Sequence, residues 1–270
     1  THYAQDIFTS RALSFLTATN LPQPFCLVLA YTLPHRQLVE PPGPNPYRHK
    51  PWPPQERTYA AMVSKLDADI GRIAAALDAN PSLASNTLLI ITSDNGPHDA
   101  DDHSPFFFNS FGNLRGGKFL LFEGGIRVPC IMRWCGVIPT NTVCSVPCGF
   151  VDIHATLAQL AGAPPPPSHG VSLLPLLSGN SLLSRPIPLL WFTPPRSPRD
   201  PIAALRSNQW KFILRADGLP KLYNLLHDPS ETQNLAPLYP DLVRSFYFTL
   251  RQQLRQQIPP LTSPSTSPPK

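Results

Sequence analysis

The residues best suited to chemistry follow two apolar runs of the chain. Asp94 and Asn95 stand in the sequence Ser-Asp-Asn-Gly-Pro, directly after the apolar residues 87–92, and His35 follows an earlier apolar run. A carboxylate next to an amide oxygen suits a hard divalent cation such as Ca²⁺ or Mg²⁺. Lys118 ends the run Leu-Arg-Gly-Gly-Lys, whose glycines let the lysine and backbone N–H groups approach an anion closely. These residue types indicate a cation site and a separate anion-binding segment.

Each of these residues also has a purely structural interpretation. Asp, Asn and Gly are the residues that turns select, so Ser-Asp-Asn-Gly alone fits an ordinary turn. A histidine after a proline, such as His35, is commonly a hydrogen-bonded loop or core residue, and the Arg-Gly-Gly-Lys run also fits an exposed flexible loop. We interpret the acidic pair Asp101–Asp102, which His98 and His103 flank, as part of a solvated, substrate-facing loop, with adventitious metal binding as the alternative.

The elements that must position these residues follow a strand–helix–strand order. Residues 25–31 form a continuous apolar run and predict a buried parallel strand, and residues 87–92 predict another. Between them, residues 56–79 carry apolar side chains at spacings of three and four, which predicts a long helix. In a βαβ crossover the two strands run parallel, so His35 and the Asp94–Asn95 pair would share the sheet edge where such folds bind ligands.

The remaining chain predicts further elements and a smaller second part. Helical periodicity or apolar runs predict a helix at 6–17, a strand at 127–134 and a helix at 150–162. Short strand candidates follow at 188–192, 203–205, 210–214 and 222–224, before a closing helix at 240–257. We therefore expect a partial α/β domain over 1–165, an antiparallel subdomain with its closing helix over 166–257, and a disordered tail over 258–270.

Composition limits the function classes. The chain has 270 residues, is 42% hydrophobic, carries 36 prolines and has a net charge of +5. Its basic residues form no stripe with interleaved aromatics, which argues against nucleic-acid binding. The sequence shows no signal peptide and no apolar run of about 18 residues that would span a membrane. Because it begins at Thr1 rather than Met, we expect a fragment.

Five cysteines are present, and four of them lie close together in the sequence. Their spacing lacks the Cys-x-x-Cys pairs of zinc ribbons. We favour free buried cysteines, or one or two disulfides, over a zinc site. The five are Cys26, Cys130, Cys135, Cys144 and Cys148.

A series of motifs in fixed order resembles the sulfatase family, of the arylsulfatase type, within the alkaline-phosphatase-like superfamily. The resemblance spans roughly residues 1–236. Its motifs are Thr-Leu-Pro-His (32–35), Ser-Asp-Asn-Gly-Pro (93–97), Leu-Arg-Gly-Gly-Lys (114–118), Phe-Glu-Gly-Gly-Ile-Arg-Val-Pro (122–129), Phe-Val-Asp (150–152), Gln-Trp-Lys-Phe (209–212) and Leu-Tyr-Asn-Leu (222–225), followed by Asp228-Pro229 and Glu231-Thr232.

The resemblance implies a role for four residues. Asp94 and Asn95 would be two ligands of the divalent cation, usually calcium in this family. His35 would contact the sulfate ester near the nucleophile, and Lys118 would hold a sulfate oxygen as the S–O bond breaks. Cationic groups and a metal around the non-bridging oxygens are what hydrolysis of a sulfate monoester requires. Three further residues belong to the matching motifs, but we expect them to be structural, with a salt bridge near the loop: Glu123, Arg127 and Asp152.

The sequence departs from the family pattern in several places. The family nucleophile, a Cys converted to formylglycine within Cys-x-Pro-x-Arg (or Ser in place of Cys), is absent, and no cysteine here fits that motif. The acidic pair expected at the end of the first strand is also missing. We therefore expect this chain alone to be inactive, although its family hydrolyses sulfate esters.

The predicted fold is thus α/β, with a mixed, mainly parallel sheet between helices, incomplete at its N-terminal side, and a smaller antiparallel C-terminal subdomain. The predicted function is a sulfuric ester hydrolase that acts with a divalent cation on a small-molecule or glycan sulfate ester. A non-catalytic truncated remnant or pseudoenzyme, and a phosphate or phosphonate ester hydrolase of the same superfamily, are the alternatives. Specificity is expected in loops 36–54 and 98–114. The resemblance implies a lysosomal, secreted or periplasmic location; substrate identity and oligomeric state stay open.

Overall fold

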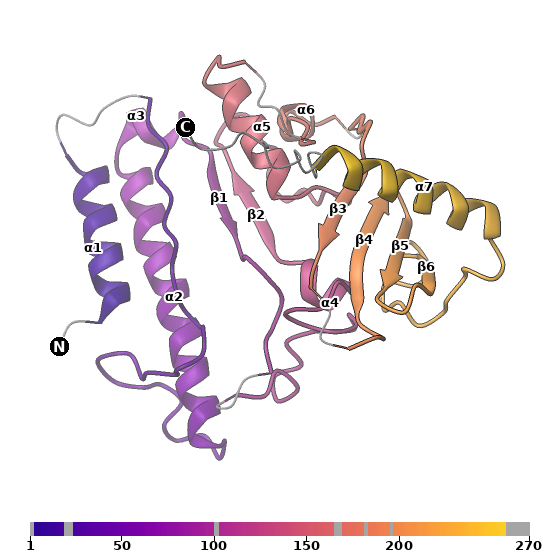
Figure 1. Cartoon of the computed structure of the whole chain (residues 1–270). Coiled ribbons are helices and arrows are strands. Elements are labelled where there is room, and N and C mark those ends of the chain that lie inside the picture. Colours follow the sequence, from indigo (N-terminus) through magenta and orange to yellow (C-terminus); the bar gives the residue numbers. More distant parts are fainter. Residues whose placement is uncertain are drawn as a thin grey trace, which may run out of the picture.

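The structure is a computed structural model that describes residues 3–18, 24–99, 103–164, 169–180, 183–194 and 197–257. Two helices, α1 (Ala4–Leu16) and α2 (Pro54–Asp78), lie side by side at one end of the molecule (Figure 1). The middle holds a two-stranded sheet of β1 (Leu89–Thr92) and β2 (Cys130–Arg133). A four-stranded sheet with one helix across it forms the other end (Figure 1).

The helix pair forms where the apolar periodicity predicts it. Pro54 occupies the first turn of α2, where its missing N–H costs no hydrogen bond. The chain leaves α2 and enters the short α3 (Pro81–Ala84), whose first N–H groups are capped by the Asn80 side chain through Ser82 N. Leucine, isoleucine and alanine side chains of the three helices form one buried cluster: Ala12, Leu16, Ile73, Leu77 and Leu83. The helices predicted at 6–17 and 56–79 are confirmed to within two residues.

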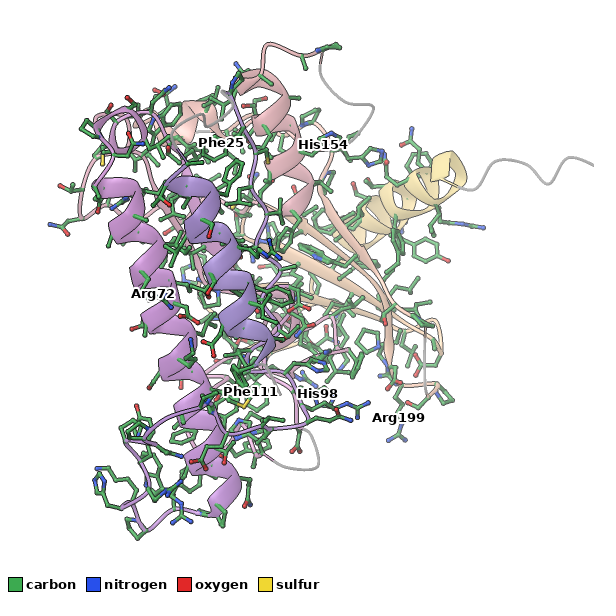
Figure 2. The ribbon with its side chains drawn as sticks, turned by 90° about the vertical axis from the view of Figure 1, so that its left-hand side faces the viewer. Phe25, Arg72, His98, Phe111, His154 and Arg199 are labelled. Atoms are coloured by element: carbon green, nitrogen blue, oxygen red, sulfur yellow. The ribbon has the colours of Figure 1, made fainter. Side chains whose placement is uncertain are left out.

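The buried parallel strand predicted at residues 25–31 is wrong. The segment belongs to no strand of the described structure, and Val28 is 79% exposed. β1 pairs instead with β2, antiparallel, with Ile90 opposite Met132. Only two residues of the segment, Phe25 (Figure 2) and Leu29, pack against the helix-pair cluster, and the residues between them are exposed. A strand also needs a partner for its backbone groups, and no strand of the described residues pairs with this segment.

The four-stranded sheet is antiparallel throughout and has the order β3-β4-β5-β6. Its strands are β3 (Leu189–Phe192), β4 (Pro201–Ser207), β5 (Trp210–Arg215) and β6 (Pro220–Asn224). The helix α7 (Pro240–Gln257) covers one face (Figure 1). The predicted short strands and the closing helix are confirmed, while the domain boundary near 165 stays a prediction. Residues 165–168 and the predicted tail at 258–270 lie outside the described residues.

Each face of this sheet is buried against a different partner. Successive side chains of a strand point to opposite faces. On one face Leu205, Phe212 and Leu222 pack against α7. On the other face Ile213 and Tyr223 pack against a loop that includes residues 120–126. This second contact joins the C-terminal sheet to the segment that follows Lys118 in the chain.

Asp152 has the structural role expected of it. It lies in the first turn of α5 (Phe150–Leu160) and is fully buried. Its carboxylate accepts hydrogen bonds from Gly149 N at 2.8 Å and Val171 N at 2.9 Å, and it pairs with Arg185 at 2.5 Å. These contacts cap α5 and hold the chain before the short α6 (Leu174–Leu177) against it.

The five cysteines are free, as one of the two predicted alternatives has it, but they are exposed rather than buried. No disulfide joins them, and among the described residues no group of three or more His, Cys, Asp or Glu is placed to hold a metal ion. In the part of the chain that the structure describes, no helix has the length and apolar character needed to cross a membrane.

Candidate functional site

Three short backbone segments stack where the predicted site residues meet. They are residues 93–97, residues 115–118 and the single-turn helix α4 (Glu123–Ile126). Gly96 N donates to Gly125 O at 3.0 Å, Lys118 N donates to Pro97 O at 2.8 Å, and Gly124 N donates to Arg115 O at 2.7 Å. The segment that carries Asp94 and Asn95 is therefore joined to Lys118 by a backbone hydrogen bond at Pro97.

Glycine is required in this stack because the backbones approach so closely. A Cβ on Gly96 would lie 1.9 Å from the carbonyl oxygen of Gly124, and a Cβ on Gly125 would lie 2.3 Å from that of Gly117. Such separations are far inside van der Waals contact, so a side chain at either position would push the segments apart. The three Gly-containing motifs of the sequence thus belong to one layer.

His35 reaches the same place from a distant part of the chain. Lys118 Nζ donates to His35 Nε2 at 3.4 Å. A hydrogen bond from His35 N to Thr32 O, 2.8 Å long, closes the turn that carries the histidine. The structure therefore brings His35 and Lys118 together, although the segment before His35 is not a paired strand.

The Asp94–Asn95 turn has the donor chemistry of a hard-cation site. Asn95 Nδ2 donates to Gly96 O at 3.0 Å, which leaves its Oδ1 as an oxygen donor beside the exposed Asp94 carboxylate. Calcium takes six to eight oxygen ligands. Two side chains fit the ion in kind but supply only part of such a set, and the described residues offer no cluster of carboxylates to complete it.

A pocket of about 450 Å³ opens beside Lys118. The Phe111 ring packs so tightly on the backbone before Lys118 that a Cβ on Gly117 would lie 2.7 Å from its Cε1 atom. Phe106 meets Phe111 edge-to-face at 5.3 Å, and His98 meets Phe119 in the same way at 5.3 Å. These two aromatic pairs line the pocket, and Figure 2 shows Phe111 and His98 at the same end of the molecule.

The C-terminal sheet completes the pocket, which the sequence did not predict. Thr193, Pro194, Asp200 and Pro201, from the end of β3 and the start of β4, also line it. The loop 98–114 contributes as expected, whereas no residue of 36–54 lines the pocket. Nothing in the Pro-rich sequence around 193–201 signalled this role, because only the packing of the sheet on the α4 loop places it there.

The interpretation of His103 as part of a solvated loop is wrong. His103 is buried, and its Nδ1 lies 2.5 Å from Glu56 Oε2 at the start of α2. The Tyr59 ring stacks on the imidazole at 3.6 Å, and Ser104 N donates to Glu56 Oε1 at 3.1 Å. These contacts anchor the start of the phenylalanine-containing loop to α2. Asp101 and Asp102 lie outside the described residues.

A buried ion-pair cluster lies on the other side of α4. Lys211 Nζ of β5 lies 2.9 Å from Glu123 Oε1 and 2.8 Å from Glu231 Oε1, and both Lys211 and Glu231 are fully buried. Arg127 lies 3.8 Å from Glu123, which confirms the salt bridge expected near the loop. Burial raises the pKa of Glu231, against the opposing effect of Lys211, and burial lowers the pKa of Arg206 nearby. Lys211 belongs to the Gln-Trp-Lys-Phe motif and Glu231 to the Glu-Thr motif. Neither motif indicated that its charged residue forms a buried ion pair.

Comparisons with known proteins agree with these motifs. A family model described as Sulfatase matches residues 1–163, and one described as N-sulphoglucosamine sulphohydrolase, C-terminal, matches residues 116–259. Arylsulfatase K of Canis lupus familiaris is 33% identical over 210 residues, covering 74% of this chain and 36% of that protein. N-acetylgalactosamine-6-O-sulfatase of Bacteroides thetaiotaomicron is 30% identical over 266 residues, covering 88% of this chain and 48% of that protein.

A solved structure extends the likeness to the fold. The crystal structure of Ps i-CgsB in complex with k-i-k-neocarrahexaose matches with a TM-score of 0.79 at 27% sequence identity, covering 94% of this chain and 55% of that one. The match confirms the predicted α/β, alkaline-phosphatase-like fold class with its smaller antiparallel C-terminal part. The chain spans from about a third to about half of the length of these proteins.

Proposed function

The chain belongs to the sulfatase family, and we propose that it supplies the sulfate-binding side chains and part of the cation site of a sulfate-ester hydrolase. The observation that carries this proposal is the contact of Lys118 with His35 beside the Asp94–Asn95 turn. Cationic and hydrogen-bonding groups next to oxygen ligands match the charge that develops on a sulfate monoester as its ester bond breaks.

Each residue has a distinct proposed role. The Lys118 ammonium would bind a non-bridging sulfate oxygen, and His35, within hydrogen-bond reach of it, would contact the ester oxygens. Asp94 and Asn95 would hold a divalent cation, calcium being the family's usual ion, and the cation would polarise the sulfate oxygens when bound. The remaining ligands would come from water, substrate or polypeptide outside the described residues.

The pocket beside Lys118 suits the alcohol part of the ester. Its phenylalanines offer flat apolar surfaces on which a ring of an aryl alcohol or a sugar can stack. Among the described residues that line it, Lys118 is the one lysine or arginine, whereas Asp99 and Asp200 are both acidic. A neutral alcohol part therefore fits the pocket better than one with additional sulfate or carboxylate groups.

The nucleophile is the part that this chain lacks. No Cys-x-Pro-x-Arg or Ser-x-Pro-x-Arg occurs in its sequence, so we propose that the 270 residues bind the ester without hydrolysing it. Turnover of 4-nitrophenyl sulfate by the chain alone would contradict this part of the proposal. In that case a nucleophile outside the family motif would have to be present.

Calorimetric titration with 4-nitrophenyl sulfate, in the presence and absence of calcium, tests the proposed site. We expect Lys118→Ala to weaken binding at least about tenfold, because a charge-assisted hydrogen bond to the anion is lost. Asp94→Asn should abolish any strengthening by calcium. Lys50→Ala, which removes an exposed lysine outside the pocket, is the matched control and should leave binding unchanged.

The same titrations separate the alternatives. Equal or tighter binding of 4-nitrophenyl phosphate would favour a phosphate ester hydrolase of the superfamily. A chain that binds neither ester nor calcium would be a non-catalytic remnant, and the proposed function would be wrong.

A further inference from the structure

The buried lysine of the C-terminal sheet is connected to the two segments that carry the candidate site residues, 93–97 and 115–118. Lys211 lies on the face of β5 that is turned away from α7, where it meets Glu123 and Glu231. Glu123 lies 88 residues before Lys211 in the sequence, so the tertiary fold brings them together. Two sets of contacts connect this cluster to the candidate site, one through α4 and one through Arg115.

The first connection passes through α4. Glu231 Oε2 accepts a hydrogen bond from Glu123 N at 2.6 Å, so the first residue of α4 is held by both its backbone and its carboxylate. The next two residues are Gly124 and Gly125, which bond to Arg115 O and Gly96 N. A shift of Glu123 would therefore move the backbones that carry Lys118 and the Asp94–Asn95 turn.

The second connection passes through Arg115, three residues before Lys118. Its Nη1 donates to Glu231 O at 2.9 Å and to Tyr223 Oη at 3.3 Å. The guanidinium also lies 4.1 Å from the centre of the Phe122 ring. The start of the Arg-Gly-Gly-Lys run is thus held against the residue that pairs with Lys211.

We propose that Lys211 is a positioning residue for the sulfate-binding site, because its ion pairs with Glu123 and Glu231 fix α4 and Arg115 against the C-terminal sheet. A buried carboxylate without its cation is strongly disfavoured, so loss of the lysine would drive the glutamates toward water or protonation. Either response would release the two loops. The proposal rests on the proposed function for what the loops bind, but the held geometry is measurable without any ligand.

Hydrogen exchange followed by mass spectrometry tests the proposal on the full chain. In Lys211→Met, which keeps most of the side-chain volume, we expect amides of residues 93–97 and 114–126 to exchange about tenfold faster or more, through local opening. Amides of α1 and α2, at the other end of the molecule, should keep their protection. Lys65→Met, which removes a lysine between two carboxylates on those helices, is the matched control and should leave 93–97 and 114–126 unchanged.

Two results would overturn the proposal: unchanged exchange at 93–97 and 114–126 in Lys211→Met, or acceleration spread evenly over α1 and α2. If Lys211→Met does not fold, Glu231→Gln is used with the same expected and contrary outcomes, since its amide keeps a hydrogen-bond acceptor for Glu123 N. A wild-type chain that binds no sulfate ester would refute the proposed function, yet the exchange measurement would still decide the role of Lys211.

Discussion

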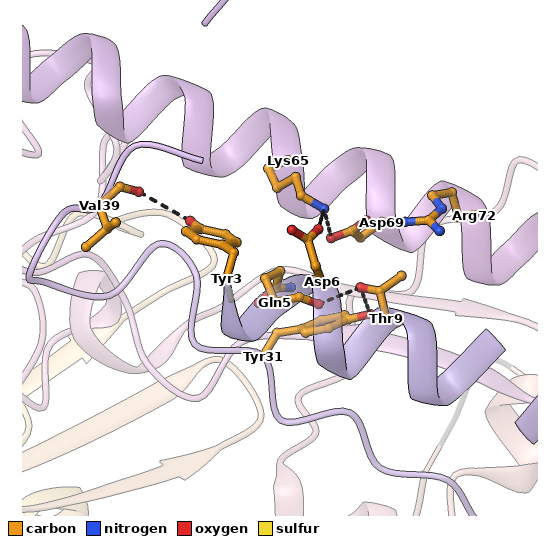
Figure 3. Close-up of polar contacts among 9 residues, drawn as sticks. All are labelled: Tyr3, Gln5, Asp6, Thr9, Tyr31, Val39, Lys65, Asp69 and Arg72. Atoms are coloured by element: carbon orange, nitrogen blue, oxygen red, sulfur yellow. Dashed lines mark hydrogen bonds and ion pairs between the residues drawn. The ribbon is translucent and has the colours of Figure 1, made fainter. Parts of the chain in front are cut away.

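Two lysines of this protein each lie between two carboxylates, and the two clusters differ in exposure rather than in distance. Lys65 Nζ of α2 lies 2.7 Å from Asp6 and 2.6 Å from Asp69, with 20% of its side chain exposed (Figure 3). Lys211 Nζ lies 2.9 Å from Glu123 and 2.8 Å from Glu231, with none of its side chain exposed. The distances alone would suggest that the two clusters are equivalent.

The surroundings of the two lysines show why the clusters are not equivalent. Asp6 is 45% exposed, so water can solvate it when the ion pair breaks. Asp69 is buried but also pairs with Arg72 at 3.2 Å, which gives it a second cation (Figure 3). Glu231 has no comparable exposure to water. The effective dielectric around the charges, rather than contact geometry, therefore decides how much a lysine contributes.

Removal of the buried lysine should have the largest effect on stability. We expect Lys211→Met to lower the free energy of unfolding by about 3–5 kcal/mol, because breaking a buried pair leaves uncompensated charge in the interior. Urea denaturation of the wild type and the variant measures the difference. A loss no larger than that of an exposed ion pair would show that Glu123 and Glu231 find other partners, and the contrast between the two lysines would disappear.

An added methyl group should change stability in opposite directions at Gly96, beside α4, and at Gly71, in α2. Gly96→Ala places a Cβ 1.9 Å from Gly124 O and should destabilise the protein by about 1–3 kcal/mol or more through overpacking. Gly71→Ala in α2 meets nothing within 4 Å and should stabilise by about 0.5–1 kcal/mol, since alanine is the better helix former. Thermal unfolding of both variants tests the pair. Equal changes of the same sign would contradict the close stacking at α4.

The pH dependence of stability should also differ between the clusters. Because burial raises the pKa of Glu231 above its ordinary value of 4.5, the folded state binds more protons than the unfolded state between the two values. The stabilising contribution of Glu231 should therefore fall as pH rises above about 4.5, and Glu231→Gln should remove that slope. Denaturation of the wild type and the variant at a series of pH values from 4 to 8 measures this slope. A stability of the wild type, relative to Glu231→Gln, that rises with pH would refute the direction.

Lys65 should contribute no such slope in that range. Partial burial disfavours the Lys65 ammonium, but its hydrogen bonds and ion pairs with Asp6 and Asp69 outweigh this and raise its pKa. Its stabilising contribution is therefore complete below the ordinary value of 10.5 and is lost only as pH rises through the raised folded value.

The smallest effect is expected from Lys65 itself. Lys65→Met should cost about 1 kcal/mol or less, because water and Arg72 compensate the two aspartates. The same urea denaturation measures it, and raising the salt concentration should shrink the difference further. A loss as large as that of Lys211→Met would mean that exposure does not separate the two clusters.

Local patterns in the sequence were sufficient for the long helices and for the antiparallel strands of the C-terminal sheet. Proline at the start of α2 and the spacing of its apolar residues are properties of a single segment, as are the limits of α7. The motifs around Asp94 and Lys118 were equally readable, because they combine donor atoms with glycines over a few residues. The structure then showed the common cause of those glycines, which is the stacking of three backbones at Gly96, Gly117 and Gly124.

The errors arose where distant segments meet. Residues 25–31 have the composition of a buried strand, but a strand exists only if another backbone lies alongside it. The C-terminal wall of the pocket and the burial of His103 against Glu56 depend in the same way on packing between elements. No local pattern of residue types encodes such contacts.

By itself, the sequence determined the long helices, the short strands, the family and the residue types of the site. Tertiary structure alone decided that Lys118 meets His35, and that Lys211 becomes a buried partner of Glu123 and Glu231 while Lys65 stays near water. The physical reason is that charge and hydrogen-bonding capacity are properties of a residue, whereas burial and the partners of a charge are properties of the packed chain.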